Sequence, residues 1–243
     1  MTTRTNDLGQ PIGEPVPGFH GSVTPTGETL EGRFCRLEKL DAALHAAALY
    51  ESLSADESGA LWTYLPEEPP RSPAELENWV ERASRLQDPL FYGLVEKSSG
   101  RCVGRAAYMR IAPGAGSIEV GSILFSPRLQ RTLAATEAMF LMMQHAFEDL
   151  GYRRYEWKCD SLNEPSRRAA ERLGFSYEGL FRQALVYKGR NRDTAWFSIL
   201  DRDWPAIRQG YEYWFDPANF DSAGRQKQTL AGFVSAARQA ADG

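Results

Sequence analysis

One segment near the middle of the chain constrains the fold more than any other, because it joins a strand-like run directly to a long apolar helix. The strand-like run ends at Phe125, and the helix-like run covers residues 132–150. The first backbone amides of a helix lack intrahelical acceptors and point at one spot, where the peptide dipoles favour an anion by about 0.3–1 kcal/mol per charge. The sequence therefore predicts a strand–loop–helix unit that binds an anion, such as a diphosphate, where the helix starts.

The segments around this unit predict a mixed α/β fold of the α+β kind, because strands joined in hairpins outnumber regular strand–helix alternation. Turns at residues 97–100 and around Gly189 indicate two hairpins. Strands are expected at residues 32–37, 91–96, 103–111, 117–125, 155–159, 180–187 and 194–200. Helices are expected after the capping residues Asp41 and Ser72, and at residues 132–150, 164–173, 203–215 and 229–241.

The 243 residues suffice for one well-buried domain with additions at its ends. Residues 1–29 contain four prolines and five glycines but few large apolar side chains, which is typical of an extended arm. The expected strands and most of the helices fall within residues 30–201, which we expect to form the domain. An aromatic-rich helix and a second helical stretch follow, so residues 202–243 are expected to be a C-terminal helical extension.

Composition narrows the classes of function. The formal net charge of −4 gives no electrostatic argument for a nucleic-acid partner. The three cysteines are far apart and the three histidines lack ligand spacing, so neither a disulfide framework nor a metal site is expected. No apolar run reaches the roughly 18 residues of a membrane span, and the N-terminus is polar rather than signal-like. We therefore expect a cytoplasmic protein without a metal, membrane or nucleic-acid partner.

Three motifs follow one another in the second half of the chain. They read Gln130-Arg131-Thr132-Leu133-Ala134-Ala135-Thr136-Glu137-Ala138, then Asn163-Glu164-Pro165-Ser166, then Leu173-Gly174-Phe175. In this order they resemble the GNAT superfamily of acetyl-CoA-dependent N-acetyltransferases, most closely its RimJ/RimL-type branch of ribosomal-protein N-terminal enzymes. The resemblance extends over residues 32–201. It implies a mostly antiparallel seven-stranded sheet that splays between its fourth and fifth strands, with flanking helices, and acetyl-CoA as the co-substrate.

The resemblance also implies a binding site for acetyl-CoA around the start of the long helix. The backbone of Leu124 and Phe125 would pair with the pantetheine arm, and one N–H group would polarise the thioester carbonyl. The phosphate-binding residues would be Gln130, Arg131, Thr132, Leu133, Ala134, Ala135 and Thr136. Leu133 replaces the central glycine of the family motif, and Arg128 offers a further phosphate contact. A well-started core helix explains the same residues without any ligand.

Two polar residues at the start of the next expected helix have both a structural and a chemical interpretation. Asn163 is a good N-cap, and Ser166 lies at the third helical position, where polar residues are favoured. The resemblance implies instead that the Asn163 amide contacts the pantetheine arm and that the Ser166 hydroxyl protonates the leaving thiolate. Ala170 stands where many GNAT members have a tyrosine for this step, which favours Ser166.

A base must remove a proton from the acceptor ammonium, because only a free amine is nucleophilic. Glu119, on the strand before the anion site, is the first candidate, and Asp160, at the end of the following strand, is the second. Strand carboxylates usually face solvent, so a water relay is the alternative. Leu185 lies near the position of the family's further candidate, a glutamate on the last hairpin. Nothing in the sequence activates Cys159 as a nucleophile.

Trp62 and Tyr64 are candidates for the wall of an acceptor pocket, and acidic residues beside them would attract a cationic amine. The other aromatic candidates are Trp79, Tyr211, Tyr213, Trp214 and Phe215. Core packing is the more common role of aromatic side chains at these spacings.

The combined prediction is transfer of an acetyl group from acetyl-CoA to a primary amine by direct attack within a ternary complex. The acceptor is either a small-molecule amine or a peptide amine, such as a protein N-terminus. Two alternatives remain open: an acyl-CoA-binding module without turnover, and a structural or interaction protein that uses only the fold. The sequence leaves the oligomeric state open, a dimer included.

Overall fold

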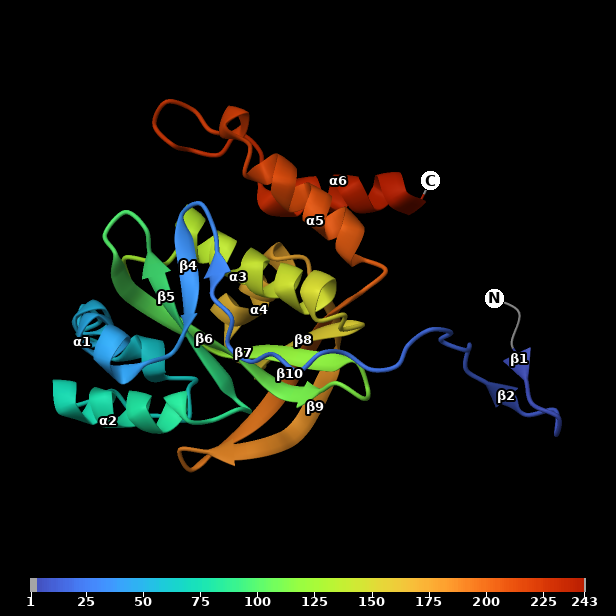
Figure 1. Ribbon diagram of the computed structural model, residues 1–243, viewed down its shortest axis with the longest axis horizontal. Coiled ribbons are helices and arrows are strands. Elements are labelled where there is room, and N and C mark those ends of the chain that lie inside the picture. Colours follow the sequence, from blue (N-terminus) through green and yellow to red (C-terminus); the bar gives the residue numbers. More distant parts are fainter. Residues whose placement is uncertain (1–3, 243) are drawn as a thin grey trace.

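The computed structural model describes residues 4–242, and its centre is one large, mostly antiparallel sheet (Figure 1). The strand order is β3-β4-β5-β6-β7-β8-β10-β9, and only the pair β7–β8 is parallel. The strands are β3 (Leu30–Glu31), β4 (Cys35–Lys39), β5 (Leu90–Glu96), β6 (Arg101–Ala112), β7 (Ser117–Phe125), β8 (Arg154–Asp160), β9 (Ser176–Tyr187) and β10 (Arg190–Leu200). The predicted fold class is confirmed, with two-residue β3 added at the edge of the seven expected strands.

The helices begin where the sequence places good caps. Asp41 accepts a hydrogen bond from the Leu44 amide, and Ser72 accepts one from the Glu75 amide. The helices are α1 (Ala42–Leu53), α2 (Pro73–Ser84), α3 (Leu133–Gln144), α4 (Glu164–Arg172), α5 (Trp204–Trp214) and α6 (Leu230–Asp242). The long helix expected at residues 132–150 ends earlier as an α-helix, because a π-helical turn, His145–Asp149, follows α3.

The two faces of the sheet carry separate cores, which is why strand β5 is buried on both sides. Tyr92 and Leu94 pack with α3 and α5 on one face, in the larger core. Phe91 and Val95 pack with α1 and α2 on the other face. Successive residues of a strand point to opposite faces, so one apolar run serves both cores.

Glu137 fixes the beginning of strand β4. Its carboxylate lies in the first half of α3 and accepts hydrogen bonds from the amides of Arg33, Phe34 and Cys35 at 2.8, 2.6 and 2.9 Å. Arg33 and Phe34 therefore belong to a bend, and the strand expected from residue 32 begins only at Cys35. The same carboxylate ties α3 to the sheet beside the predicted anion site.

Strands β7 and β8 form a fork. Residues 117–120 of β7 pair with residues 154–157 of β8, and the pairing then stops although both strands continue. The register between β6 and β7 shifts next to Ser122, whose φ is 51°. A bulge of this kind bends a strand away from its neighbour. The predicted splay between the fourth and fifth strands of the expected sheet is thus confirmed.

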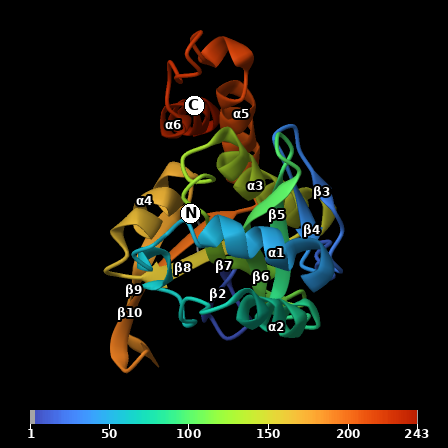
Figure 2. The same ribbon diagram turned by 90° about the vertical axis from the view of Figure 1, so that its left-hand side faces the viewer.

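Both ends of the chain lie outside the sheet. The strands β1 (Arg4–Thr5) and β2 (Pro11–Ile12) form a small hairpin that projects from the body. Helices α5 and α6 lie beyond α3 and α4 in both views (Figures 1 and 2). The boundaries of the predicted arm, domain and extension, at residues 1–29, 30–201 and 202–243, stay a prediction; residues 1–3 and 243 lie outside the described part.

Candidate active site

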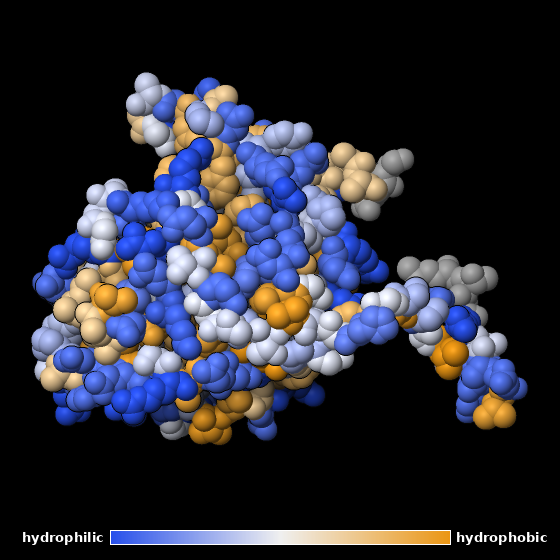
Figure 3. Space-filling view, viewed as in Figure 1, coloured by the Kyte–Doolittle hydropathy of each residue, from blue (hydrophilic) through white to orange (hydrophobic). Residues whose placement is uncertain are grey.

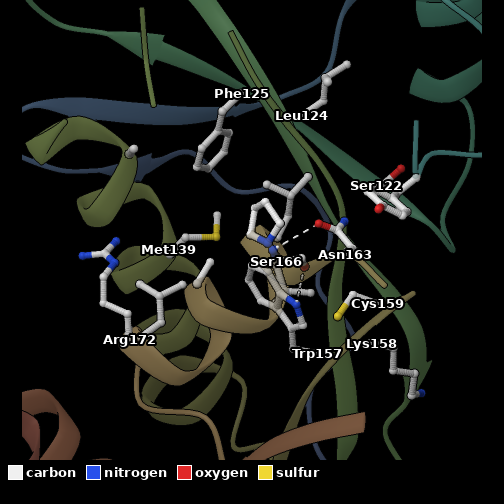
Figure 4. A pocket seen from close by; sticks show the side chains of 18 of the residues that line it. Ser122, Leu124, Phe125, Met139, Trp157, Lys158, Cys159, Asn163, Ser166 and Arg172 are labelled. Atoms are coloured by element: carbon white, nitrogen blue, oxygen red, sulfur yellow. Dashed lines mark hydrogen bonds between the residues drawn. The ribbon is translucent and has the colours of Figure 1, made fainter. Parts of the chain in front are cut away.

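A cavity of about 1480 Å³ opens where β7 and β8 part. Its walls come from β7, β8, the starts of α3 and α4, the β9–β10 hairpin, and the segment that follows α5. Pockets for drug-sized ligands occupy about 300–1,000 Å³, so this cavity has room for a long ligand and a second substrate. Figure 4 shows Ser166 of α4 between Phe125 of β7 and Trp157 of β8.

The start of α3 presents free backbone amides to this cavity. The Thr132 hydroxyl caps the helix and accepts a hydrogen bond from the Ala135 amide at 3.1 Å. Within residues 4–242, the amides of Arg131, Leu133 and Ala134 have no hydrogen-bond partner. Arg131 has a φ of 61° and makes the sharp turn into the helix. Several unpartnered N–H groups at one helix start form a site for an anion.

Leu133 occupies the first position of α3 and is absent from the residues with a positive φ, so the backbone there does not require glycine. Its side chain packs partly against the core and partly lines the cavity. The Gln130 side chain lines the cavity too and donates a hydrogen bond to the Phe125 carbonyl at 3.1 Å. Ala134 is buried in the core and does not line this cavity, although its amide has no hydrogen-bond partner among the described residues.

Three arginines near this helix start have different partners. Arg128 pairs with Glu96 at 2.5 Å and does not line the cavity, and its expected phosphate contact stays a prediction. Arg131 and Arg172 both line the cavity and form no ion pair with the carboxylates of the described residues. Arg172 donates instead to the Thr136 hydroxyl at 3.2 Å. The anion site thus has two uncompensated cations beside its free amides.

Asn163 and Ser166 make the contacts of a helix cap and also line the cavity. The Asn163 side chain accepts a hydrogen bond from the Ser166 amide at 3.2 Å. The Trp157 indole N–H donates to the Ser166 hydroxyl oxygen at 3.0 Å. An indole N–H cannot accept, so the hydroxyl proton remains available to another acceptor. Cys159 lies next to Ser166, and burial raises the pKa of the Cys159 thiol (Figure 4).

Glu119 is buried and already holds two cations. Its carboxylate pairs with Arg110 at 2.7 Å and with Lys158 at 2.9 Å. Lys158 also pairs with Glu156 at 2.7 Å and lies 3.9 Å from the centre of the Trp196 ring. Glu119 lines the cavity within a network of fixed charges rather than as an isolated carboxylate.

Asp160 is also buried at the cavity wall, but its partners are neutral. It accepts hydrogen bonds from the Leu162 amide at 2.9 Å and from the Tyr187 hydroxyl at 2.8 Å. Burial and the neighbouring Asp160 raise the pKa of Tyr187 to about 12, so its phenol stays protonated at neutral pH. Asp160 therefore brings an uncompensated negative charge to the end of β8.

A family model described as an acetyltransferase (GNAT) domain matches residues 35–176, more than half of the chain. The chain belongs to the GNAT acetyltransferase family. The family expected from the three sequence motifs is thereby confirmed. The fork and the free amides at the start of α3 are therefore features of a GNAT acetyltransferase domain. Within residues 4–242, no helix is long and apolar enough to cross a membrane, and no cluster of side chains could hold a metal ion.

The relatives of this GNAT acetyltransferase agree with the assignment. A GCN5-related N-acetyltransferase from Brucella melitensis, known from a crystal structure, is 51% identical, with 90% of this chain and 100% of that chain covered and a TM-score of 0.88. RimL, a ribosomal-protein alpha-N-acetyltransferase solved with coenzyme A, shares the fold at 20% identity, with 71% and 98% covered and a TM-score of 0.61. The uncharacterized N-acetyltransferase YnaD of Bacillus subtilis (strain 168) is 26% identical over 37% of this chain. That alignment spans only 53% of YnaD.

Of the two residues predicted to contact the acceptor in this GNAT acetyltransferase, only Tyr64 lines the cavity. Trp62 is buried among α1 and α2 side chains and does not line this cavity, and its expected contact with the acceptor stays a prediction. Trp62 occupies this position because its large apolar ring helps to fill the core between the sheet and helices α1 and α2. Trp79 packs 4.0 Å from the Arg105 guanidinium, and Tyr211 of α5 is buried against Phe140 of α3.

Sequence reasoning missed three residues of the acceptor side. Lys158, Tyr187 and Trp196 all line the cavity. Their positions depend on the pairing of β10 with β8, in which Trp196 faces Lys158, and on the fold of the β9–β10 hairpin. The alternation along residues 154–160 could have placed Lys158 on the same face as Glu156, but nothing local indicates its partners across the sheet.

Proposed function

We propose that this GNAT acetyltransferase transfers the acetyl group of acetyl-CoA to a primary amine by direct attack, with both substrates bound together. The observation that carries the proposal is the continuous cavity that joins the free amides at the start of α3 to the fork and to the Ser166 hydroxyl. Acetyl-CoA combines a diphosphate with an activated thioester, and a cavity of this shape can receive both. The volume beyond the fork is left for the amine.

The donor end is held mainly by backbone groups in this proposal. The amides of Arg131, Leu133 and Ala134 bind the diphosphate, and the Arg131 and Arg172 side chains add charge-assisted contacts. Along residues 121–125, the edge of β7 that faces β8 has no strand partner. Successive residues of a strand direct their N–H and C=O groups to opposite edges, so the Phe125 amide can pair with the pantetheine arm, whereas the Leu124 backbone faces β6.

Ser166 is assigned the role of the acid. The amine attacks the thioester carbonyl carbon, a C–N bond forms, and the C–S bond breaks with its electron pair on sulfur. The Ser166 hydroxyl then gives its proton to that sulfur and recovers one from solvent. Because the Trp157 N–H occupies a lone pair of the Ser166 oxygen, the proton is directed elsewhere. A backbone N–H of β7 would stabilise the oxyanion at the carbonyl, a contribution worth about 2.7–4 kcal/mol.

The two carboxylates receive different roles. Asp160 has only neutral partners, so its negative charge attracts the acceptor ammonium and takes its proton, directly or through water. Glu119 is held by Arg110 and Lys158 and positions Lys158 over Trp196. The aromatic rings of Tyr187, Trp196 and Phe181 line the same region, which favours an amine carried by an apolar group.

The test is the release of free coenzyme A thiol from acetyl-CoA in the presence of a panel of primary amines. The panel contains aromatic and aliphatic small amines and short peptides with free N-termini. Mass spectrometry should find a gain of one acetyl group on the best acceptor. Tight binding of acetyl-CoA with no turnover on any amine would contradict the proposal and favour a binding module.

A further inference from the structure

The cavity does not end at the start of α3 but continues to the C-terminal extension. The same space is bounded by a group of residues from the end of α5 and the loop that follows it, namely Trp214, Phe220, Gly224, Arg225 and Gln226. This loop lies outside residues 35–176, the part matched by the family model. The extension therefore adds a wall to the site that the family domain does not itself supply.

The loop after α5 is held in a defined shape. The Trp214 indole donates to the Gln226 side chain at 2.7 Å. The Asn219 side-chain amide donates to the Trp214 carbonyl at 3.1 Å and to the Gln228 carbonyl at 3.2 Å. These two hydrogen bonds close the loop at its base. Arg225 pairs with Asp221 at 2.8 Å near the tip. Arg225 thus brings a largely exposed guanidinium, paired with Asp221, to the edge of the cavity.

The extension is also fixed to the domain. The Tyr211 hydroxyl donates to the Leu173 carbonyl at 3.1 Å, and the Arg33 guanidinium donates to the Phe215 carbonyl at 2.9 Å. Phe140 of α3 stacks on Tyr211 with ring centres 5.0 Å apart. From the side of Figure 1, hydrophobic residues are visible between the C-terminal helices and the domain below them (Figure 3). The wall formed by the loop is therefore part of one body with α3.

The order of the thioester, the diphosphate and the adenosine along coenzyme A determines which of these groups lies next to the wall formed by the loop after α5. If the thioester lies at Ser166 and the diphosphate at the start of α3, the adenosine 3′-phosphate must lie on the side of α3 away from the fork. Arg172 lies on the opposite side of the pocket from Lys158 in Figure 4, which marks that direction. Arg172 and Arg225 both line the cavity there, and Arg172 has no carboxylate partner among the described residues.

We propose that the C-terminal extension is the binding site for the adenosine 3′-phosphate end of coenzyme A. Arg225 and Arg172 bind the 3′-phosphate, and Phe220 packs against the adenosine. This inference rests on the proposed function, because it takes acetyl-CoA as the donor. It makes the extension a device that distinguishes coenzyme A from carriers that lack the 3′-phosphate.

The experiment is calorimetric titration of the full-length protein with coenzyme A and with 3′-dephospho-coenzyme A. The wild type should bind coenzyme A about tenfold more tightly, equivalent to ~1.4 kcal/mol. Arg225→Ala should remove most of this preference by weakening coenzyme A alone. Arg202→Ala is the matched control, because Arg202 belongs to the extension, is exposed and lies outside the cavity.

Arg172→Ala tests the same preference for coenzyme A over 3′-dephospho-coenzyme A at a residue of α4. Arg168→Ala, on the same helix, is its control. Equal affinity of the wild type for the two ligands would overturn the inference, and so would an equal loss for both ligands in Arg225→Ala. In those cases binding itself would still support the proposed function. Failure of the wild type to bind either ligand would instead overturn the proposed function, and the inference with it.

Discussion

The two ends of the cavity bind through different parts of the chain. At the start of α3, the binding groups are backbone amides, helped by arginines without carboxylate partners. Beyond the fork, they are individual side chains such as Glu119 of β7, Asp160 at the end of β8 and Tyr187 of β9, each held by named partners. In the proposed function, the donor end should therefore tolerate changes of side chain, such as Leu133 in place of glycine, whereas the acceptor end should depend on each residue.

The largest expected effect comes from Ser166→Ala, which removes the proposed acid where the two ends meet. The turnover number should fall by about a hundredfold or more, since general acid catalysis contributes typically 10²–10⁴-fold. The affinity for acetyl-CoA should change by less than about threefold, because backbone amides hold the diphosphate. Steady-state kinetics and calorimetry separate the two quantities. Ser176→Ala, an exposed serine outside the cavity, is the control; an unchanged turnover number in Ser166→Ala would remove Ser166 from the mechanism.

The next effect separates the two carboxylates of the acceptor end. Asp160→Asn should lower kcat/KM for the amine by about ten- to a hundredfold and leave acetyl-CoA binding intact, as expected for loss of a general base. Glu119→Gln should have a smaller effect on kcat/KM and a larger one on stability, because it leaves Arg110 and Lys158 without their shared partner. The reverse ranking in steady-state kinetics would exchange the two assigned roles.

Glu137→Gln tests how much the Glu137 carboxylate contributes to the stability of the fold beside the start of α3. The change weakens three hydrogen bonds from the amides of residues 33–35 to a buried carboxylate. The free energy of unfolding should fall by about 2 kcal/mol, in line with hydrogen bonds to charged groups. Urea denaturation followed by circular dichroism measures it. A loss below about 0.5 kcal/mol, the scatter of ordinary surface changes, would show that Glu137 is dispensable.

Thr132→Ala should lower the free energy of unfolding by less than Glu137→Gln does. The change removes the cap of α3 and frees the Ala135 amide, at about 1 kcal/mol of stability. Coenzyme A affinity should stay within about threefold of the wild type, because the ligand binds the neighbouring amides. Thr132→Ser keeps the cap and serves as the control. A tenfold loss of affinity in Thr132→Ala alone would mean that the donor end depends on a side chain after all.

The smallest effect concerns the base of the fork. Hydrogen bonds from Arg154 lower the pKa of Glu178 from 4.5 to about 2. A carboxylate with a lowered pKa stabilises the fold fully above its ordinary value, and this contribution disappears as the pH falls from about 4.5 toward 2. Glu178→Gln should therefore lower stability slightly at pH 7 and flatten its decline across that acidic range. Equal pH dependence of the unfolding midpoint in both proteins would contradict this.

Local chemistry and the family resemblance together predicted most of the fold. The caps at Asp41 and Ser72, the bounds of β7 and the fork all follow from sequence patterns or from the family resemblance. Strand β9 was expected from residue 180 but begins at Ser176, because its pairing with β10 extends past the expected bound. Such an extension depends on the partner strand rather than on local propensity.

The candidate site was predictable where it consists of backbone and not where side chains meet across the sheet. The segment from Gln130 to Thr136 was expected from a contiguous motif, and all of its residues except Ala134 line the cavity. The pairing of Arg128 with Glu96 and the burial of Trp62 depend on residues far away in sequence. Of the wall made by the extension, only Trp214 was among the expected pocket residues; the loop that follows α5 was missed, since its place requires the docking of α5 on the domain.

A crystal structure of the protein with acetyl-CoA tests the central claim most directly. The account predicts that diphosphate oxygens lie within hydrogen-bond distance of the Leu133 and Ala134 amides, with the acetyl group in the fork between Phe125 and Ser166. A diphosphate bound elsewhere, with these two amides still unpartnered and the fork empty, would contradict it.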